Sequence, residues 1–130
     1  MRASTLPDGL PAGEAVATGA GRLPARWVIH TVGPDARRGQ TDPALLASCF
    51  TRSLEVASGL GARSVAFPAV SAGVFGWAAG EVARVAVGAV RAWAEQSEPA
   101  DDGAPRPSLV RFVLFSEPLL AAFDKALATA

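Results

Sequence analysis

The sequence predicts an α/β fold, with strands and helices alternating along a layered sheet. Short apolar segments alternate with longer segments whose apolar residues recur at helical spacing. One short segment, Ser64–Phe67, has the continuous apolar character of a strand buried on both faces in a parallel sheet. Half of the 130 residues are hydrophobic, so a chain of this length can bury one core and form a single domain.

Two strands are predicted in the first third of the chain. Met1–Gly13 is rich in proline, glycine and polar residues and is predicted as a loop. Glu14–Thr18 is predicted as a short strand, which the glycines that follow interrupt. Trp27–Val32 combines aromatic and β-branched residues and ends at Gly33 and Pro34, so it is the stronger strand prediction.

The first helix is predicted to begin at Pro43, because Asp42 is a favourable N-cap and proline suits the first helical position. It is expected to run to about Ser58 and to end at Gly59 and Gly61. Its apolar face should contain five residues: Leu46, Cys49, Phe50, Leu54 and Ala57.

Two further helices and one strand complete the pattern. A helix is expected over residues 78–94, with an apolar stripe of Val82, Val85, Ala86, Ala89 and Trp93. Gln96–Ser108 contains three prolines and is predicted as a loop. A strand at Val110–Phe115 then leads to a helix over residues 118–128, in which Leu119, Leu120, Phe123 and Leu127 are in register.

Charge and composition exclude several classes of function. Twelve basic residues balance twelve acidic ones, which predicts no nucleic-acid or membrane partner. The single cysteine, Cys49, cannot form a disulfide within the chain, and a core role is favoured over a nucleophilic one. No signal peptide or membrane span is recognisable, so a cytoplasmic location is expected.

The loop after Ser64–Phe67 carries the strongest chemical signal. Ligands of α/β sheets bind where strands end, and backbone N–H groups beside a helix N-terminus favour anions. Gly73 and Gly76 allow close backbone approach to a phosphate, and Ser71 adds a hydroxyl. An ordinary glycine-containing connection is an equally good interpretation of the spacing. The Walker A and GxGxxG patterns are both absent.

Four blocks together resemble the macrodomain family, in the branch of O-acetyl-ADP-ribose deacetylases and mono-ADP-ribosyl hydrolases. They occur in the family's order: LPARWVIHTVGP (23–34), LLASCF (45–50), SVAFPAVSAGVFGW (64–77) and VRFVLFSEPLLAAF (110–123). The resemblance implies a three-layer α/β/α mixed sheet whose ligand is ADP-ribose or a derivative. No cofactor and no metal are expected.

The resemblance also implies the site. The loop Ser71–Gly76 would wrap the diphosphate and the distal ribose, and the aromatic ring of Phe115 would lie against the adenine. The expected ligand-binding residues are Ser71, Ala72, Gly73, Val74, Phe75, Gly76 and Phe115, with Trp77 and Ser116 as additional walls. His30 is expected to be a structural strand residue, and Arg37 with Arg38 an exposed pair in a loop.

The family's first third has no counterpart in these residues, so 1–130 is expected to be a partial macrodomain. That third holds an Asn-Ala-Ala-Asn strand and a glycine-rich loop with an aspartate, so no catalytic residue is assigned. The strand would lie between Trp27–Val32 and Ser64–Phe67, so the gap is expected to close, to be filled by another segment or chain, or to leave the fragment poorly folded.

ADP-ribose binding is therefore the first functional hypothesis. Hydrolysis of ADP-ribosyl or O-acetyl-ADP-ribose esters is the alternative if the catalytic segment is supplied upstream or in trans. The third hypothesis is a scaffold that binds no ligand and self-associates through exposed sheet edges.

Overall fold

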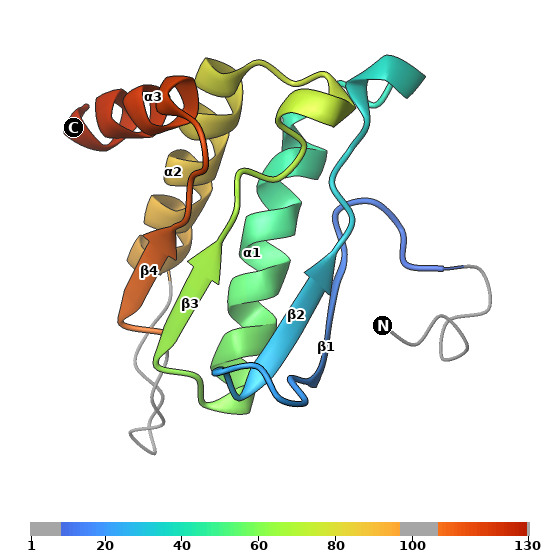
Figure 1. The fold of residues 1–130 in the computed structure, drawn as a ribbon, viewed down its shortest axis with the longest axis vertical. Coiled ribbons are helices and arrows are strands. Elements are labelled where there is room, and N and C mark those ends of the chain that lie inside the picture. The colour runs from blue at the N-terminus through green and yellow to red at the C-terminus, as the bar shows by residue number, and fades with distance from the viewer. Residues whose placement is uncertain (1–8, 97–106, 130) are drawn as a thin grey trace.

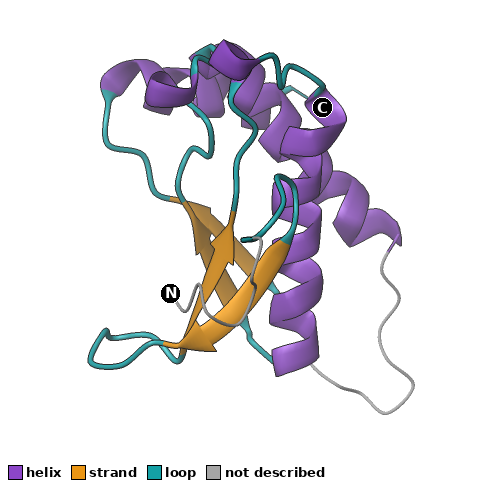
Figure 2. Ribbon diagram, turned by 90° about the vertical axis from the view of Figure 1, so that its right-hand side faces the viewer, coloured by secondary structure: helices purple, strands orange, loops and turns teal. Residues whose placement is uncertain are grey.

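The strands and helices alternate as the sequence predicts, and the fold is of the α/β class (Figures 1 and 2). The structure is a computed structural model that describes residues 9–96 and 107–129. The predicted loops Met1–Gly13 and Gln96–Ser108 therefore lie largely outside the described residues. The elements are β1 (Ala15–Gly19), β2 (Trp27–Thr31), η2 (Ala36–Arg38), α1 (Pro43–Leu60), β3 (Ser64–Phe67), η3 (Gly73–Phe75), α2 (Ala79–Gln96), β4 (Leu109–Phe112) and α3 (Glu117–Ala128), where η denotes a single 3-10 turn.

The four described strands form two separate pairs. β1 and β2 are antiparallel, with Ala15 opposite Thr31, and β3 and β4 are parallel, with Ser64 opposite Leu109. No hydrogen-bonded ladder joins β2 to β3 among these strands, although both point in the same direction in front of α1 (Figure 1). The gap expected between these two strands is therefore not closed by pairing. In Figure 2 the long helices lie on one side of the strands.

Local signals fix both ends of α1. The Asp42 side chain accepts a hydrogen bond from the backbone N–H of Ala44 and caps the N-terminus, as predicted. Gly61 has a φ of 76° and donates its N–H to the carbonyls of Ala57 and Ser58, which ends the helix. The prediction that Gly59 helps to end α1 is wrong. Gly59 lies within the helix, because only Gly61 takes the left-handed conformation.

Aromatic rings connect α1 to the β3–β4 pair. Phe50 is fully buried, and its ring centroid lies 5.0 Å from that of Phe67 in an edge-on arrangement. Phe112 on β4 stacks on Phe67 at 6.1 Å and lies 4.8 Å from Phe123 of α3. The predicted apolar face of α1 is confirmed, since all five of its residues are buried: Leu46, Cys49, Phe50, Leu54 and Ala57.

Three expectations about burial are corrected. β3 is not buried on both faces, because Ser64 and Ala66 are exposed and only Phe67 is buried. Leu120 and Leu127 of α3 are 52% and 50% exposed, since periodicity does not reveal which part of an apolar stripe a neighbouring helix covers. The predicted strand ending at Phe115 is shorter, because parallel pairing of β4 with β3 stops at Phe112.

The stripe predicted on α2 is confirmed for Val82, Val85, Ala86 and Ala89, which are buried.

His30 lies on β2, and its Nε2 is 2.9 Å from the Thr18 hydroxyl on the paired strand, in accord with a structural role. None of the helices within residues 9–96 and 107–129 is long and apolar enough to cross a membrane.

Candidate functional site

The loop between β3 and α2 has an unusual backbone. Three of its residues have positive φ angles: Ser71 at 69°, Gly73 at 74° and Gly76 at 83°. Among the described residues, Ser71 is the one non-glycine residue in this conformation. Glycine adopts the left-handed region freely, whereas serine needs compensating contacts. The loop is therefore held by other parts of the chain.

The carbonyl oxygen of Pro34 supplies those contacts. It accepts the Ser71 hydroxyl at 2.8 Å and the indole N–H of Trp77 at 3.0 Å. Gly33 lies so close that an added Cβ would be 2.3 Å from the Ser71 Oγ. We call Gly33, Pro34, Ser71 and Trp77 the Pro34 clamp. It ties the start and the end of the loop to the segment that follows β2.

Two predicted site residues, Ser71 and Trp77, use their side-chain hydrogen-bond donors within the clamp. The hydroxyl hydrogen of Ser71 is directed at Pro34, so this side chain first stabilises the loop. Trp77 is 5% exposed and also donates to Pro34, which places its ring beneath the loop. Sequence reasoning did not anticipate the clamp, because Ser71 and Trp77 lie 37 and 43 residues from Pro34.

Four of the predicted site residues meet in one cavity of about 230 Å³. Ala72 and Gly73 come from the loop, while Phe115 and Ser116 come from the segment between β4 and α3. The Phe115 ring is 84% exposed, so it is available to a ligand. Sequence reasoning missed the other three lining residues, which are Ala79, Pro118 and Leu119.

Two helices begin at the edge of this cavity. Ala79 is the first residue of α2, and Ser116 is the N-cap of α3, where it accepts the N–H of Leu119 at 3.4 Å. Helix N-termini carry partial positive charge and favour anions. The proline at 118 and the serine at 116 are helix-start signals, so the sequence did contain a trace of this arrangement.

Two of the remaining predicted residues, Phe75 and Gly76, do not line this cavity. Phe75 is half-buried and packs against the core. Gly76 is exposed, and an added Cβ there would be 3.1 Å from the Cγ of Arg37. The backbone of Val74 lies in η3, whereas its side chain lies outside the described part of the structure.

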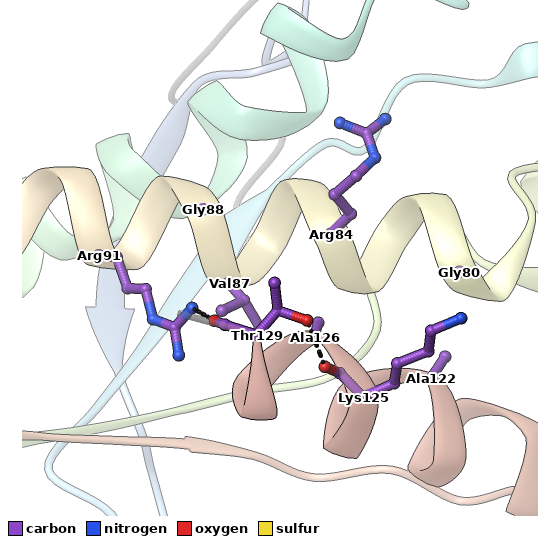
Figure 3. Close-up of a pocket in the computed structure, with 9 residues that line it drawn as sticks. All are labelled: Gly80, Arg84, Val87, Gly88, Arg91, Ala122, Lys125, Ala126 and Thr129. Carbon is purple, nitrogen blue, oxygen red and sulfur yellow. Dashed lines mark hydrogen bonds between the residues drawn. The ribbon is translucent and has the colours of Figure 1, made fainter.

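A larger groove of about 480 Å³ lies between α2 and α3 (Figure 3). None of the predicted site residues lines it. Arg91 closes one end by donating to the carbonyls of Thr129 and Leu127 at 2.6 and 2.7 Å. The groove is formed by the sides of two helices, and the loop Ser71–Gly76 does not line it. We therefore place the site at the smaller cavity.

Metal and thiol chemistry find no support in the described part of the chain. Within residues 9–96 and 107–129, no three His, Cys, Asp or Glu side chains gather as a metal-binding group. Cys49 is buried and its Sγ lies 3.3 Å from the Val32 carbonyl. Burial raises the pKa of the Cys49 thiol, which keeps it protonated at neutral pH.

A protein-family model described as Macro domain matches residues 2–86. A macro domain-containing protein of Streptomyces griseus is 50% identical over 128 residues, which cover 98% of this chain and 67% of that protein. A macro domain-containing protein of Listeria monocytogenes is 43% identical over 116 residues, covering 88% of this chain and 63% of that protein.

Two groups of solved structures are also similar. A variant of the Oceanobacillus iheyensis macrodomain with ADPR superposes with a TM-score of 0.82 at 32% identity, covering 98% of this chain and 66% of that one. The Trypanosoma brucei macrodomain in complex with ADP-ribose gives a TM-score of 0.78 at 33% identity, covering 92% and 47%. The chain thus spans about two thirds or less of the length of these relatives.

Proposed function

Because this chain belongs to the macro domain family, we propose that it binds ADP-ribose or a derivative of ADP-ribose. The observation that carries the proposal is the cavity that joins Ala72 and Gly73 to Phe115 and Ser116. Its volume of about 230 Å³ suits one end of a dinucleotide-sized ligand, since whole small-molecule sites are roughly 300–1,000 Å³.

The ligand is oriented by the chemistry of the two ends of the site. The exposed ring of Phe115 offers a flat apolar surface for the adenine base. The diphosphate lies over Gly73–Gly76, where the loop backbone and the N-termini of α2 and α3 favour negative charge. The distal ribose then points toward Gly76.

Binding is proposed in preference to hydrolysis because of the groups that line the cavity. Its described side chains are apolar apart from the hydroxyl of Ser116, which caps α3. A hydrolase needs a group that positions or activates water, and no carboxylate, imidazole or thiol lines this cavity in the described part of the chain. The cavity therefore supports recognition of the nucleotide.

Calorimetric titration of the purified chain with ADP-ribose tests the proposal, with AMP as the comparison ligand. We expect saturable heat for ADP-ribose and weaker binding of AMP, because AMP lacks the second phosphate and the distal ribose. Circular dichroism establishes that the titrated sample is folded. A folded chain that gives no heat with ADP-ribose contradicts the proposal and favours the scaffold hypothesis.

The Phe115→Ala variant tests the proposed adenine contact. Stacking of a base on an aromatic side chain is worth about 1–3 kcal/mol, so we expect ADP-ribose affinity to fall by roughly 10-fold or more. Stability should hardly change, because the ring is 84% exposed. Leu109→Ala is the matched control, since Leu109 is also exposed and starts β4. Equal affinities for the two variants would place the adenine elsewhere.

A further inference from the structure

The turn η2 lies against the far end of the candidate site. A Cβ added to Gly76 would be 3.1 Å from the Cγ of Arg37 and 3.6 Å from the Cβ of Ala36. The Cγ of Arg37 therefore lies beside Gly76, the last residue of the loop Ser71–Gly76, although Gly76 itself remains exposed. Arg38 belongs to the same turn and is exposed, but it is not among the three nearest neighbours of this position.

Asp35 holds the Arg37 guanidinium in a defined orientation. The Nε and Nη2 atoms of Arg37 lie 3.3 and 3.4 Å from the two carboxylate oxygens of Asp35. The carboxylate also caps η2 by accepting the backbone N–H of Arg37 at 3.0 Å. These contacts lower the pKa of Asp35, because hydrogen bonds from Arg37 outweigh the effect of desolvation. The carboxylate therefore stays ionised at neutral pH.

The exposed partner of this ion pair is the cation. The Arg37 side chain is 59% exposed, whereas that of Asp35 is 11% exposed. A guanidinium has five N–H donors, so donors remain for a second acceptor after those directed at Asp35. A planar guanidinium whose orientation is already fixed is well suited to a carboxylate.

We propose that Arg37 is a specificity-determining residue that recognises an acidic side chain next to the ADP-ribosylated residue of a target protein. This inference rests on the proposed function, which directs the distal ribose toward Gly76. In an ADP-ribosylated protein the target side chain is joined to the distal ribose, so the target peptide leaves the site past Gly76 and Arg37. The substrate class is thus an ADP-ribosylated protein with acidic flanking residues.

Two synthetic peptides test the inference. Both carry ADP-ribose on one serine; glutamates flank that serine in the first, and glutamines flank it in the second. The wild-type chain is expected to bind the glutamate peptide about fivefold more tightly at low salt, since an exposed ion pair contributes at most about 1 kcal/mol. Arg37→Gln should reduce this ratio to about one. Arg38→Gln removes the same charge from the adjacent residue and should leave the ratio near fivefold.

Free ADP-ribose, titrated in parallel, separates the two proposals. If it does not bind, the proposed function fails and this inference fails with it. If it binds but the wild-type chain treats both peptides alike, only the role of Arg37 is overturned. Equal loss of the preference in both arginine variants also overturns that role, because a diffuse positive field would then explain it. Arg37→Glu should reverse the preference toward the glutamine peptide.

Discussion

Replacing Gly73 with glutamate is expected to abolish measurable ADP-ribose binding, with a loss of roughly 100-fold or more, or about 3 kcal/mol. Gly73 lines the cavity with a φ of 74°, and no atom lies within 4 Å of an added Cβ. The loss is therefore not a packing effect. It comes from a carboxylate placed beside the diphosphate. The strain of a left-handed glutamate, about 1–2 kcal/mol, instead lowers the stability of the folded chain.

Gly21→Glu is the control for this variant. Gly21 also has a positive φ, 61°, and open space around an added Cβ. It precedes β2, at the end of the strands opposite to the ligand loop (Figure 1). Both variants should lose similar stability by urea denaturation, whereas only Gly73→Glu should lose the calorimetric signal for ADP-ribose. Unchanged affinity for ADP-ribose in Gly73→Glu would contradict the proposed position of the diphosphate over this loop.

Gly33→Ala is expected to lower the free energy of unfolding by about 2 kcal/mol and to weaken ADP-ribose binding by roughly 10-fold. The new Cβ would be 2.3 Å from the Ser71 Oγ, 2.7 Å from the Val70 Cγ1 and 3.3 Å from the Ser71 backbone nitrogen. The loop must move away from β2 to relieve these contacts. The hydrogen bond from Ser71 to Pro34 is then lost, and the positive φ of Ser71 loses its support.

A double-mutant cycle tests whether contact with the Pro34 clamp causes the loss of stability in Gly33→Ala. Ser71→Gly removes the clashing Oγ and suits the φ of 69°, so Gly33→Ala should cost about 1 kcal/mol less in that background. Gly88→Ala is the control for a glycine-to-alanine change that meets no neighbouring atom, and it should raise stability. Gly88 lies within α2 with no atom within 4 Å of an added Cβ, so alanine should stabilise the chain by about 0.5–1 kcal/mol. Strictly additive effects of the substitutions at 33 and 71 would contradict the clamp.

Features set by neighbouring residues were predictable from the sequence. Asp42 and Pro43 at the start of α1 and Gly61 at its end act within one turn, and the structure places the helix between them. The loop Ser71–Gly76 was recognisable as a candidate phosphate site because its small residues follow a strand and precede a helix, although the spacing fitted an ordinary connection equally well. The resemblance to the macrodomain family connected Phe115 to this loop, and Phe115 lines the same cavity as Ala72 and Gly73.

Features that join distant segments were not predictable from local patterns. The left-handed Ser71 depends on a carbonyl 37 residues away, and serine seldom adopts that conformation alone. Arg37 was predicted as part of an exposed pair, and its exposure is confirmed, but its contact with Gly76 depends on how η2 folds back over the loop. The exposure of Leu120 and Leu127 likewise depends on the extent of the contact with α2.

The separation of the β1–β2 pair from the β3–β4 pair has a consequence for the order of folding. β1, β2 and α1 are consecutive in the chain, and their contacts are complete at Leu60. The β3–β4 ladder instead pairs Ser64 with Leu109, so the whole of α2 must be synthesised before it closes. Since no backbone ladder joins the two pairs in the described residues, the hairpin and α1 can form during translation, ahead of the loop Ser71–Gly76, which then hydrogen-bonds to Pro34.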